Sequence, residues 1–151
     1  MDFLKYALIE AEKAYERGEV PIGAVIVKDN KIIARGYNKR EETQDVTMHA
    51  EIIAIKEACE KIGSWRLSEC EMYVTLEPCM MCMGAILQSR ISKLHIGTFN
   101  QDMGCCGSVL NLADNRRIGS FVDVIWEYDN RCSDILNKFF RNKRNKYRPK
   151  K

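Results

Sequence analysis

His49-Ala50-Glu51 and Pro78-Cys79-Met80-Met81-Cys82 are the two segments around which this chain must fold. One imidazole and two thiolates form a ligand set typical of zinc. A structural zinc site is closed by four protein ligands, whereas a catalytic site keeps three and leaves the fourth position to water. The sequence therefore predicts a catalytic zinc, with Glu51 as the adjacent general acid and base. The expected ligands are His49, Cys79 and Cys82.

Both segments are expected to lie at the start of a helix. A strand-like run at 70–76 stops before Pro78, and residues 80–90 have the pattern of a helix. Residues 48–61 are expected to form another helix, with Thr47 as its N-cap. Helix N-termini favour the thiolate, which is the form of cysteine that binds metal. Each residue alone would more often be structural, but the combination favours one metal ion between two helix starts.

Length and composition indicate one globular domain that covers residues 1–151. The chain is 46% hydrophobic and 30% charged, without an apolar run of membrane-spanning length or a signal-like N-terminus. We therefore expect a cytoplasmic protein that does not associate with a membrane. Its seven cysteines are an odd number and favour reduced thiols over a disulfide framework. A redox role for Cys105-Cys106 is the disfavoured alternative, because adjacent cysteines seldom bridge each other.

The hydrophobic periodicity predicts an α/β fold in which helices cover both faces of a sheet. Two of the expected strands form a hairpin around the turn Asp29-Asn30. A glycine-rich loop is expected before the last strand. In chain order, the expected elements are a helix at 3–17, strands at 22–28 and 31–37, a helix at 48–61, a strand at 70–76, a helix at 80–90, strands at 93–97 and 122–126, and a helix from about 129.

Several stretches together resemble the bacterial tRNA adenosine deaminases of the TadA type, which belong to the cytidine deaminase-like superfamily. The resemblance implies a three-layer α-β-α sandwich with a five-stranded mixed sheet, and a homodimer with one Zn²⁺ per subunit. It also implies hydrolytic deamination of adenosine to inosine at the wobble position, A34, of a tRNA anticodon stem-loop. The matching stretches are 19–25, 36–38, His49-Ala50-Glu51, Trp65-Arg66-Leu67, 73–82, 84–86 and Phe139-Phe140-Arg141.

The same resemblance implies roles for individual residues. His49, Cys79 and Cys82 would hold zinc, and Glu51 would move protons between water, the adenine ring and the leaving ammonia. The substrate would contact the side chain of Asn38, the backbone amide of Ala50, and Asn100. Two of these assignments have structural alternatives. Asn38 could be an ordinary turn residue after the strand at 31–37, and Glu77 could either shape the pocket or be purely structural.

Positive charge is concentrated in a C-terminal helix and tail, at about 138–151. The formal net charge is only +3, and the rest of the chain has more acidic than basic residues. Clustered basic residues bind nucleic acid by releasing counterions from phosphates. The alternative is a solubilising helix end that complements the helix dipole. The cluster comprises Arg141, Lys143, Arg144, Lys146, Arg148, Lys150 and Lys151.

Three loops, at 45–48, 98–108 and 118–121, depart from the family pattern. Asn100 stands where an acidic residue is usual, which suggests looser discrimination between RNA and DNA. These departures keep a second reading open, in which the chain deaminates a free nucleobase or nucleoside of the guanine, cytosine or adenosine type. A third reading, a non-catalytic subunit or RNA-binding module, predicts loss of Glu51 or of a zinc ligand, and all four residues are present.

Overall fold

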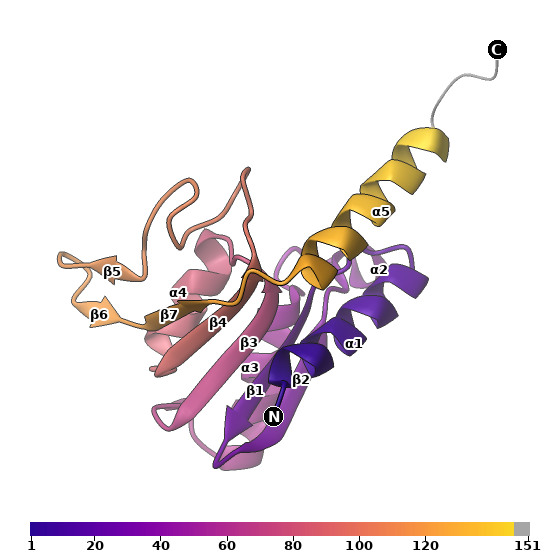
Figure 1. Ribbon diagram of the computed structural model, residues 1–151. Coiled ribbons are helices and arrows are strands. Elements are labelled where there is room, and N and C mark those ends of the chain that lie inside the picture. The colour runs from indigo at the N-terminus through magenta and orange to yellow at the C-terminus, as the bar shows by residue number, and fades with distance from the viewer. Residues whose placement is uncertain (147–151) are drawn as a thin grey trace.

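A mixed five-stranded sheet organises the computed structural model, which describes residues 1–146 (Figure 1). The order of the strands is β2-β1-β3-β4-β7, and a separate two-stranded sheet joins β5 to β6. The elements are α1 (Phe3–Glu16), β1 (Gly23–Lys28), β2 (Lys31–Tyr37), α2 (Arg40–Thr43), α3 (Ala50–Ile62), β3 (Cys70–Leu76), α4 (Met80–Gln88), β4 (Lys93–Thr98), β5 (Asp114–Asn115), β6 (Ser120–Phe121), β7 (Asp123–Trp126) and α5 (Asn130–Lys146).

The pairing of the strands brings the loops after β3 and β4 to one edge of the sheet. Strand β1 is antiparallel to both β2 and β3, whereas β3, β4 and β7 run parallel. The predicted hairpin is present, and Asp29 and Asn30 have φ angles of 50° and 62°. Positive φ at both central residues is the requirement of a type I′ turn, whose twist matches that of the flanking strands.

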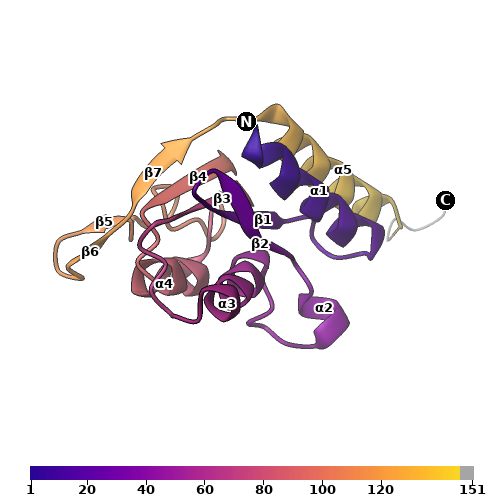
Figure 2. The ribbon, with the colours of Figure 1, turned by 90° about the horizontal axis from the view of Figure 1, so that it is seen from below.

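Helices cover both faces of the sheet, as the three-layer α-β-α prediction required. Helices α1 and α5 lie on one side, and α3 and α4 lie on the other (Figure 2). Two glycines allow close contact. A Cβ on Gly23 would overlap the backbone of α1, and a Cβ on Gly36 would overlap the carbonyl oxygen of Ala50 in α3. Because successive strand residues point to opposite faces, the β1–β2 hairpin can hold one helix on each side.

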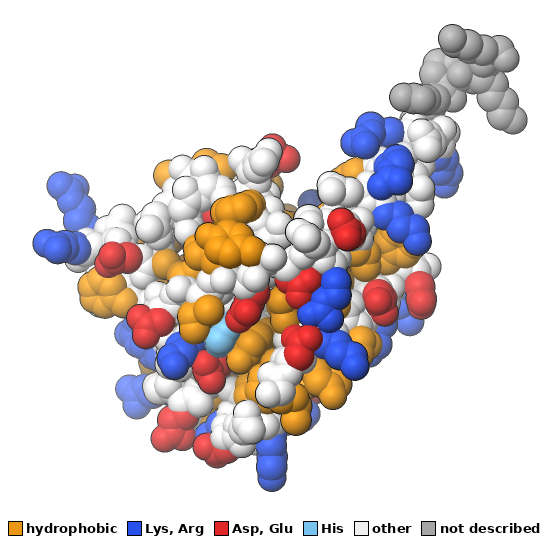
Figure 3. Space-filling model, viewed as in Figure 1, with side chains coloured by type: hydrophobic (Ala, Val, Ile, Leu, Met, Phe, Trp, Pro, Cys, Tyr) orange, Lys and Arg blue, Asp and Glu red, His pale blue; other side chains and the backbone are white. Residues whose placement is uncertain are grey.

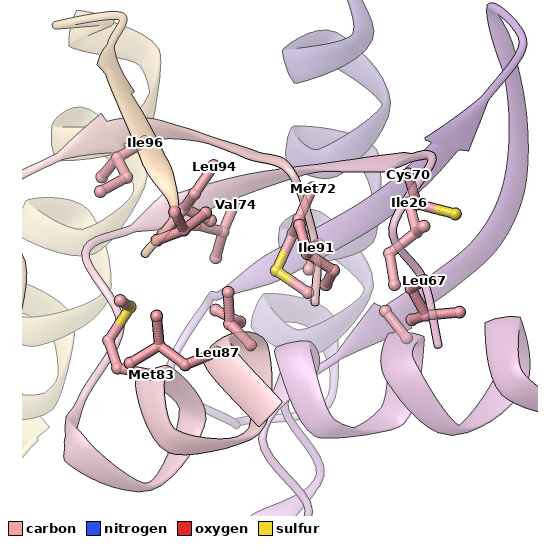
Figure 4. Close-up of a cluster of buried hydrophobic side chains, with 14 of the residues drawn as sticks. Ile26, Leu67, Cys70, Met72, Val74, Met83, Leu87, Ile91, Leu94 and Ile96 are labelled. Carbon is pink, nitrogen blue, oxygen red and sulfur yellow. The ribbon is translucent and has the colours of Figure 1, made fainter. Parts of the chain in front are cut away.

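The larger hydrophobic core lies between the sheet and helices α3 and α4. Alternate residues of β3 and β4 point into it, namely Met72 and Val74 from β3 and Leu94 and Ile96 from β4 (Figure 4). Met83 and Leu87 of α4 meet them from the other side. This packing fixes the position of α4, whose first turn carries the two predicted cysteine ligands.

The sequence prediction was wrong in three places. Thr47 is not an N-cap, because its hydroxyl donates to Asp45 Oδ1 at 2.7 Å, and α3 begins two residues later with His49 as its N-cap. The short helix α2 and the β5–β6 hairpin were both missed, because elements of four and two residues carry no periodicity.

In the described residues, 1–146, we find no helix with the length and apolarity needed to span a bilayer.

Candidate active site

The predicted ligands His49, Cys79 and Cys82 come together where helices α3 and α4 begin. His49 is the N-cap of α3 and Cys79 is the N-cap of α4. Neither residue makes a side-chain capping hydrogen bond within residues 1–146. Both side chains therefore point away from their own helices and toward each other. The Nδ1 atom of His49 lies 3.7 Å from Cys79 Sγ and 3.6 Å from Cys82 Sγ.

This arrangement fits a tetrahedral metal ion. The three ligand atoms all lie within 4.8 Å of one another. Zn–S bonds of about 2.3 Å and Zn–N bonds of about 2.0–2.1 Å at tetrahedral angles would separate nitrogen from sulfur by about 3.6 Å. The observed nitrogen–sulfur distances match that separation. The His-Cys-Cys cluster thus fits a metal ion held by three protein ligands, and no fourth His, Cys, Asp or Glu side chain joins the cluster in residues 1–146.

The two cysteines differ in their acidity. A hydrogen bond from the Cys82 thiol lowers the pKa of Cys79 to about 4. The same hydrogen bond, together with burial, raises the pKa of Cys82. A hydrogen bond to Cys79 also raises the pKa of His49. Without a bound cation, these side chains therefore share a single thiolate charge, whereas a divalent cation would favour both thiolates.

Glu51 lies in the first turn of α3, two positions after His49, and its side chain is buried. Burial raises the pKa of the Glu51 carboxyl group to about 6. A carboxyl group with a pKa near neutrality can both accept and return a proton, which is the requirement for general acid and base catalysis. Glu51 thus combines a position beside the ligand cluster with the acidity suited to proton transfer.

The site opens into a cavity of about 530 Å³. Its walls come from the segment before β1, from the loop after β2, from the ends of β3 and β4, and from α5. We did not predict the contribution of α5. A signal was present in the sequence, because the four lining residues follow the spacing of one helical face. They are Ser133, Leu136, Asn137 and Phe140.

The three predicted substrate-binding residues occupy different positions. Asn38 is buried in the cavity wall, where its amide donates to the Val20 carbonyl at 3.2 Å and its oxygen accepts from the Arg40 N–H at 3.2 Å. Ala50 is fully buried and does not line the cavity. Asn100 lines the cavity, and its side-chain oxygen accepts from the Met103 N–H at 3.2 Å.

Glu77 anchors the loop that follows β4. Its buried carboxylate accepts hydrogen bonds from the backbone N–H groups of Asn100, Cys106 and Ser108 at 3.1, 2.8 and 3.1 Å, and from the Ser108 hydroxyl. A Cβ on Gly104 would overlap this carboxylate. Charge-assisted hydrogen bonds of this kind are about twice as strong as neutral ones. Glu77 therefore holds the loop in place and also lines the cavity itself, so the structure agrees with both of the roles considered for it.

Comparison with known proteins places this site in a family. The model of the MafB19-like deaminase family matches residues 1–144. The tRNA-specific adenosine deaminase of Bacillus subtilis (strain 168) is 45% identical over 145 residues, which cover 95% of this chain and 90% of the relative. That of Aquifex aeolicus (strain VF5) is 46% identical over 95% of each chain. The chain belongs to the TadA-type tRNA adenosine deaminase family.

Solved structures agree with membership of the TadA-type family. A structure from work on A-to-I editing by tRNA:A34 deaminases superposes with a TM-score of 0.85 and 42% identity, covering 89% of this chain and 98% of that one. The guanine deaminase of Bacillus subtilis superposes less completely, with a TM-score of 0.63 and 41% identity over 66% of this chain and 64% of that one. The cytidine deaminase-like fold expected from the sequence is thus confirmed.

Proposed function

We propose that the protein is a zinc-dependent hydrolase that deaminates adenosine to inosine at the wobble position, A34, of tRNA. The observation that carries this proposal is the position of Glu51. Its buried carboxyl group lies in the same helical turn as His49 and faces the cavity beside the His-Cys-Cys cluster. The family relationship supports the choice of substrate, because similar proteins with this fold are tRNA-specific adenosine deaminases.

His49, Cys79 and Cys82 would hold the zinc ion, one per subunit. A histidine and two cysteines are a donor set that zinc prefers over magnesium or calcium, whose ligands are oxygens. When bound, zinc would supply a Lewis acid that makes water acidic near neutral pH. The nitrogen–sulfur distances of 3.6 and 3.7 Å support this assignment.

Glu51 would move the protons of the reaction. Its carboxylate takes one proton from the attacking water and delivers it to the adenine ring nitrogen next to C6. The second water proton then passes through Glu51 to the departing amino group. The C6–O bond forms, the C6–N bond breaks, and adenosine plus water gives inosine plus ammonia. One carboxyl group can serve both steps because its pKa is raised toward neutrality.

The target nucleotide would enter the cavity between α5 and the loop after β4. Asn38 and Asn100 line this cavity and would contact the nucleotide. Ala50 does not line the cavity, so the contact proposed between this residue and the edge of the base would be made by its backbone N–H alone. The N–H of Ala50 has no backbone acceptor among the hydrogen bonds of residues 1–146, because it lies in the first turn of α3. Basic residues at the end of α5 would attract the phosphates of the anticodon stem-loop.

Helix α4 supports the homodimer expected of this family. Its nine residues, Met80 to Gln88, include no charged side chain, and Met80 is 60% exposed. A Cβ on Gly84 would meet no atom of the described residues within 4 Å. A helix that is apolar on all sides normally has both faces covered. We propose that a second copy of the chain covers the outer face of α4.

The chain would act in the cytosol as a single deaminase domain over residues 1–151. All seven cysteines are free thiols, which agrees with a reducing compartment and disfavours a redox pair at Cys105-Cys106. The basic helix and tail predicted at about 138–151 lie partly within the described residues. Arg141, Lys143, Arg144 and Lys146 lie in the last two turns of α5, whereas Arg148, Lys150 and Lys151 fall outside the described residues.

The proposal is tested by incubating zinc-loaded enzyme with an anticodon stem-loop that contains A34, and in parallel with free adenosine, adenine, guanine, cytosine and cytidine. We expect inosine only in the stem-loop, and no product from a Glu51→Ala variant that still binds one metal ion. The similarity to a guanine deaminase makes a free nucleobase or nucleoside the second candidate substrate. Ammonia from such a compound, with the stem-loop unchanged, would establish that second activity instead.

A further inference from the structure

Two exposed aromatic residues and one half-buried one form a cluster beside the catalytic cavity. Phe99 follows β4, Trp126 ends β7, and Tyr128 lies in the connection from β7 to α5. The Phe99 ring is 5.0 Å from the Trp126 ring and 5.5 Å from the Tyr128 ring, and the Trp126 and Tyr128 rings stack at 5.8 Å with an interplanar angle of 17°. We call these three residues the aromatic platform.

The platform is open to solvent and continuous with the site. Phe99 is 49% exposed and Tyr128 is 62% exposed. Phe99 also lines the catalytic cavity, so the ring surface extends outward from the place where the target base would bind. Figure 3 shows hydrophobic side chains gathered over the end of β4 and the β7–α5 connection. Adjoining exposed apolar side chains mark an interaction site more often than singly exposed ones do.

The backbone holds these rings in place. On either side of Tyr128, the N–H groups of Glu127 and Asp129 donate to the carbonyls of Ile96 and Gly97, both at 2.9 Å. Tyr128 itself has a φ of 49°, in the left-handed region that costs a residue with a side chain about 1–2 kcal/mol. Strain of this kind tends to persist at functional positions. The protein therefore keeps the Tyr128 ring exposed at a cost in conformational energy.

Hydrogen bonds of its two neighbours in the chain hold the backbone at Phe99 in a similar way. The Thr98 carbonyl accepts from the Glu77 N–H at 2.9 Å, and the Asn100 N–H donates to the Glu77 carboxylate at 3.1 Å. The residues next to Tyr128 in the chain, Glu127 and Asp129, are acidic. Arg131 lies close by, but it is paired with Asp129 at 2.6 Å and with Asp2 at 3.0 Å, so the platform chiefly offers ring faces to a ligand. A preorganised ring surface of this kind suits the face of a nucleobase, and RNA-binding proteins use such stacking on unpaired bases.

We propose that the aromatic platform stacks against an unpaired base that neighbours the target adenosine in the RNA loop. This inference rests on the proposed function, because it assumes that the substrate is a nucleotide within an RNA loop. The platform would hold the flanking base while the target base occupies the cavity. It would thereby act in positioning and in selecting substrates with an unstacked neighbour, and it would take no part in proton transfer.

The test compares two stem-loops, one ordinary and one with an abasic nucleotide next to A34. Binding is measured by fluorescence anisotropy in the Glu51→Ala background, so that no turnover occurs. For Phe99→Leu and Tyr128→Leu, we expect affinity for the ordinary stem-loop to fall by about 5-fold to 150-fold, the range of one lost stacking contact. Affinity for the abasic stem-loop should change little. The matched control is Trp65→Leu, an exposed aromatic residue between α3 and β3.

A Tyr128→Gly variant separates stacking from folding. Glycine tolerates the left-handed backbone, so the thermal midpoint should be kept or raised while affinity for the ordinary stem-loop falls. Equal losses of affinity for both stem-loops, or no loss for either, would overturn the inference. A lower dimer fraction of the platform variants in sedimentation would also overturn it, by making the platform an interface between copies. Deamination by the wild-type enzyme separates this inference from the proposed function. If the proposed function is wrong, no stem-loop yields inosine; if only the platform inference is wrong, the wild type still produces inosine in the stem-loop.

Discussion

Gly36 of β2 lies directly against the carbonyl oxygen of Ala50, the residue between His49 and Glu51. A side chain at position 36 would also press on the Ala54 N–H and the Ile53 Cβ, so it would push the start of α3 away from the sheet. The positions of His49 and Glu51 thus depend on the absence of one methyl group in a neighbouring strand.

For Gly36→Ala, we expect a free energy of unfolding lower by about 1–3 kcal/mol, as for other overpacked sites. Turnover should fall further than stability alone explains, because His49 and Glu51 move with the helix. The measurements are chemical denaturation and single-turnover deamination. The control is Ser68→Ala, at an exposed position between α3 and β3, which should change stability by less than about 0.5 kcal/mol and leave turnover unchanged. Normal turnover by the Gly36 variant would contradict the argument.

Replacing Glu77 by Gln is expected to loosen the loop after β4. The amide keeps one oxygen, but its NH₂ group then faces backbone donors that the carboxylate had accepted. Loss of a charge-assisted hydrogen bond to a buried donor costs about 1.5–3 kcal/mol. We therefore expect the free energy of unfolding to fall by that amount. Hydrogen exchange at the backbone N–H groups of Cys106 and Ser108 should become faster, and the metal content should not change. Glu69→Gln, at a side chain that is 78% exposed, should change stability by less than about 1 kcal/mol.

Metal removal is expected to destabilise the protein as well as inactivate it. His49 and Cys79 begin their helices without side-chain caps, so a bound ion would fasten α3 to α4 and stabilise the folded state by mass action. A chelator should therefore lower the thermal midpoint. The Cys79→Ser variant should lose the metal, and chelator should then not change its thermal midpoint further. The Cys59→Ser variant, whose change lies outside the cluster, should retain one equivalent of metal. An unchanged midpoint in the wild type after complete metal loss would disprove the coupling.

The sequence was sufficient to predict the His-Cys-Cys cluster and most elements, because residue types, helix starts and alternation in strands are local signals. It could not reveal the role of Glu77, whose partners lie 23 to 31 positions further along the chain. The N-cap of α3 was misassigned because Thr47 has the right chemistry for a cap but is engaged by Asp45. The platform also escaped notice, since Phe99 and Tyr128 meet only after β4 and β7 pair.

The basic end of α5 is expected to contribute to RNA affinity through charge. Lys143→Gln combined with Lys146→Gln should weaken stem-loop binding at low salt and reduce the slope of log affinity against log salt by about 1–2. The same two changes at Lys31 and Lys61, which lie in the β1–β2 hairpin and at the end of α3, should have little effect. Deleting residues 141–151 should weaken binding further. Unchanged affinity after that deletion would make this cluster a solubilising helix end.

Asn100→Asp is expected to increase the preference for RNA over DNA. Aspartate keeps the acceptor for the Met103 N–H and adds a negative charge at the cavity wall, to which a ribose 2′-hydroxyl can donate. The measurement is the ratio of deamination rates on RNA and DNA stem-loops of the same sequence. Asn30→Asp, in the turn of the β1–β2 hairpin, is the control. Identical ratios for the wild type and the Asn100 variant would remove the hypothesis.

The cavity depends on a contact between the two ends of the chain, because α5 forms one of its walls. The residues that line the cavity run from Val20 to Phe140, and the last of them belong to α5. Helix α5 packs on α1, where the Tyr15 ring contacts the Phe139 ring and the Tyr15 hydroxyl accepts from the Asn142 amide at 2.8 Å. The chamber that would take a base is therefore closed by the contact between the first and last helices of the fold, although the His-Cys-Cys cluster and Glu51 lie on neither of them.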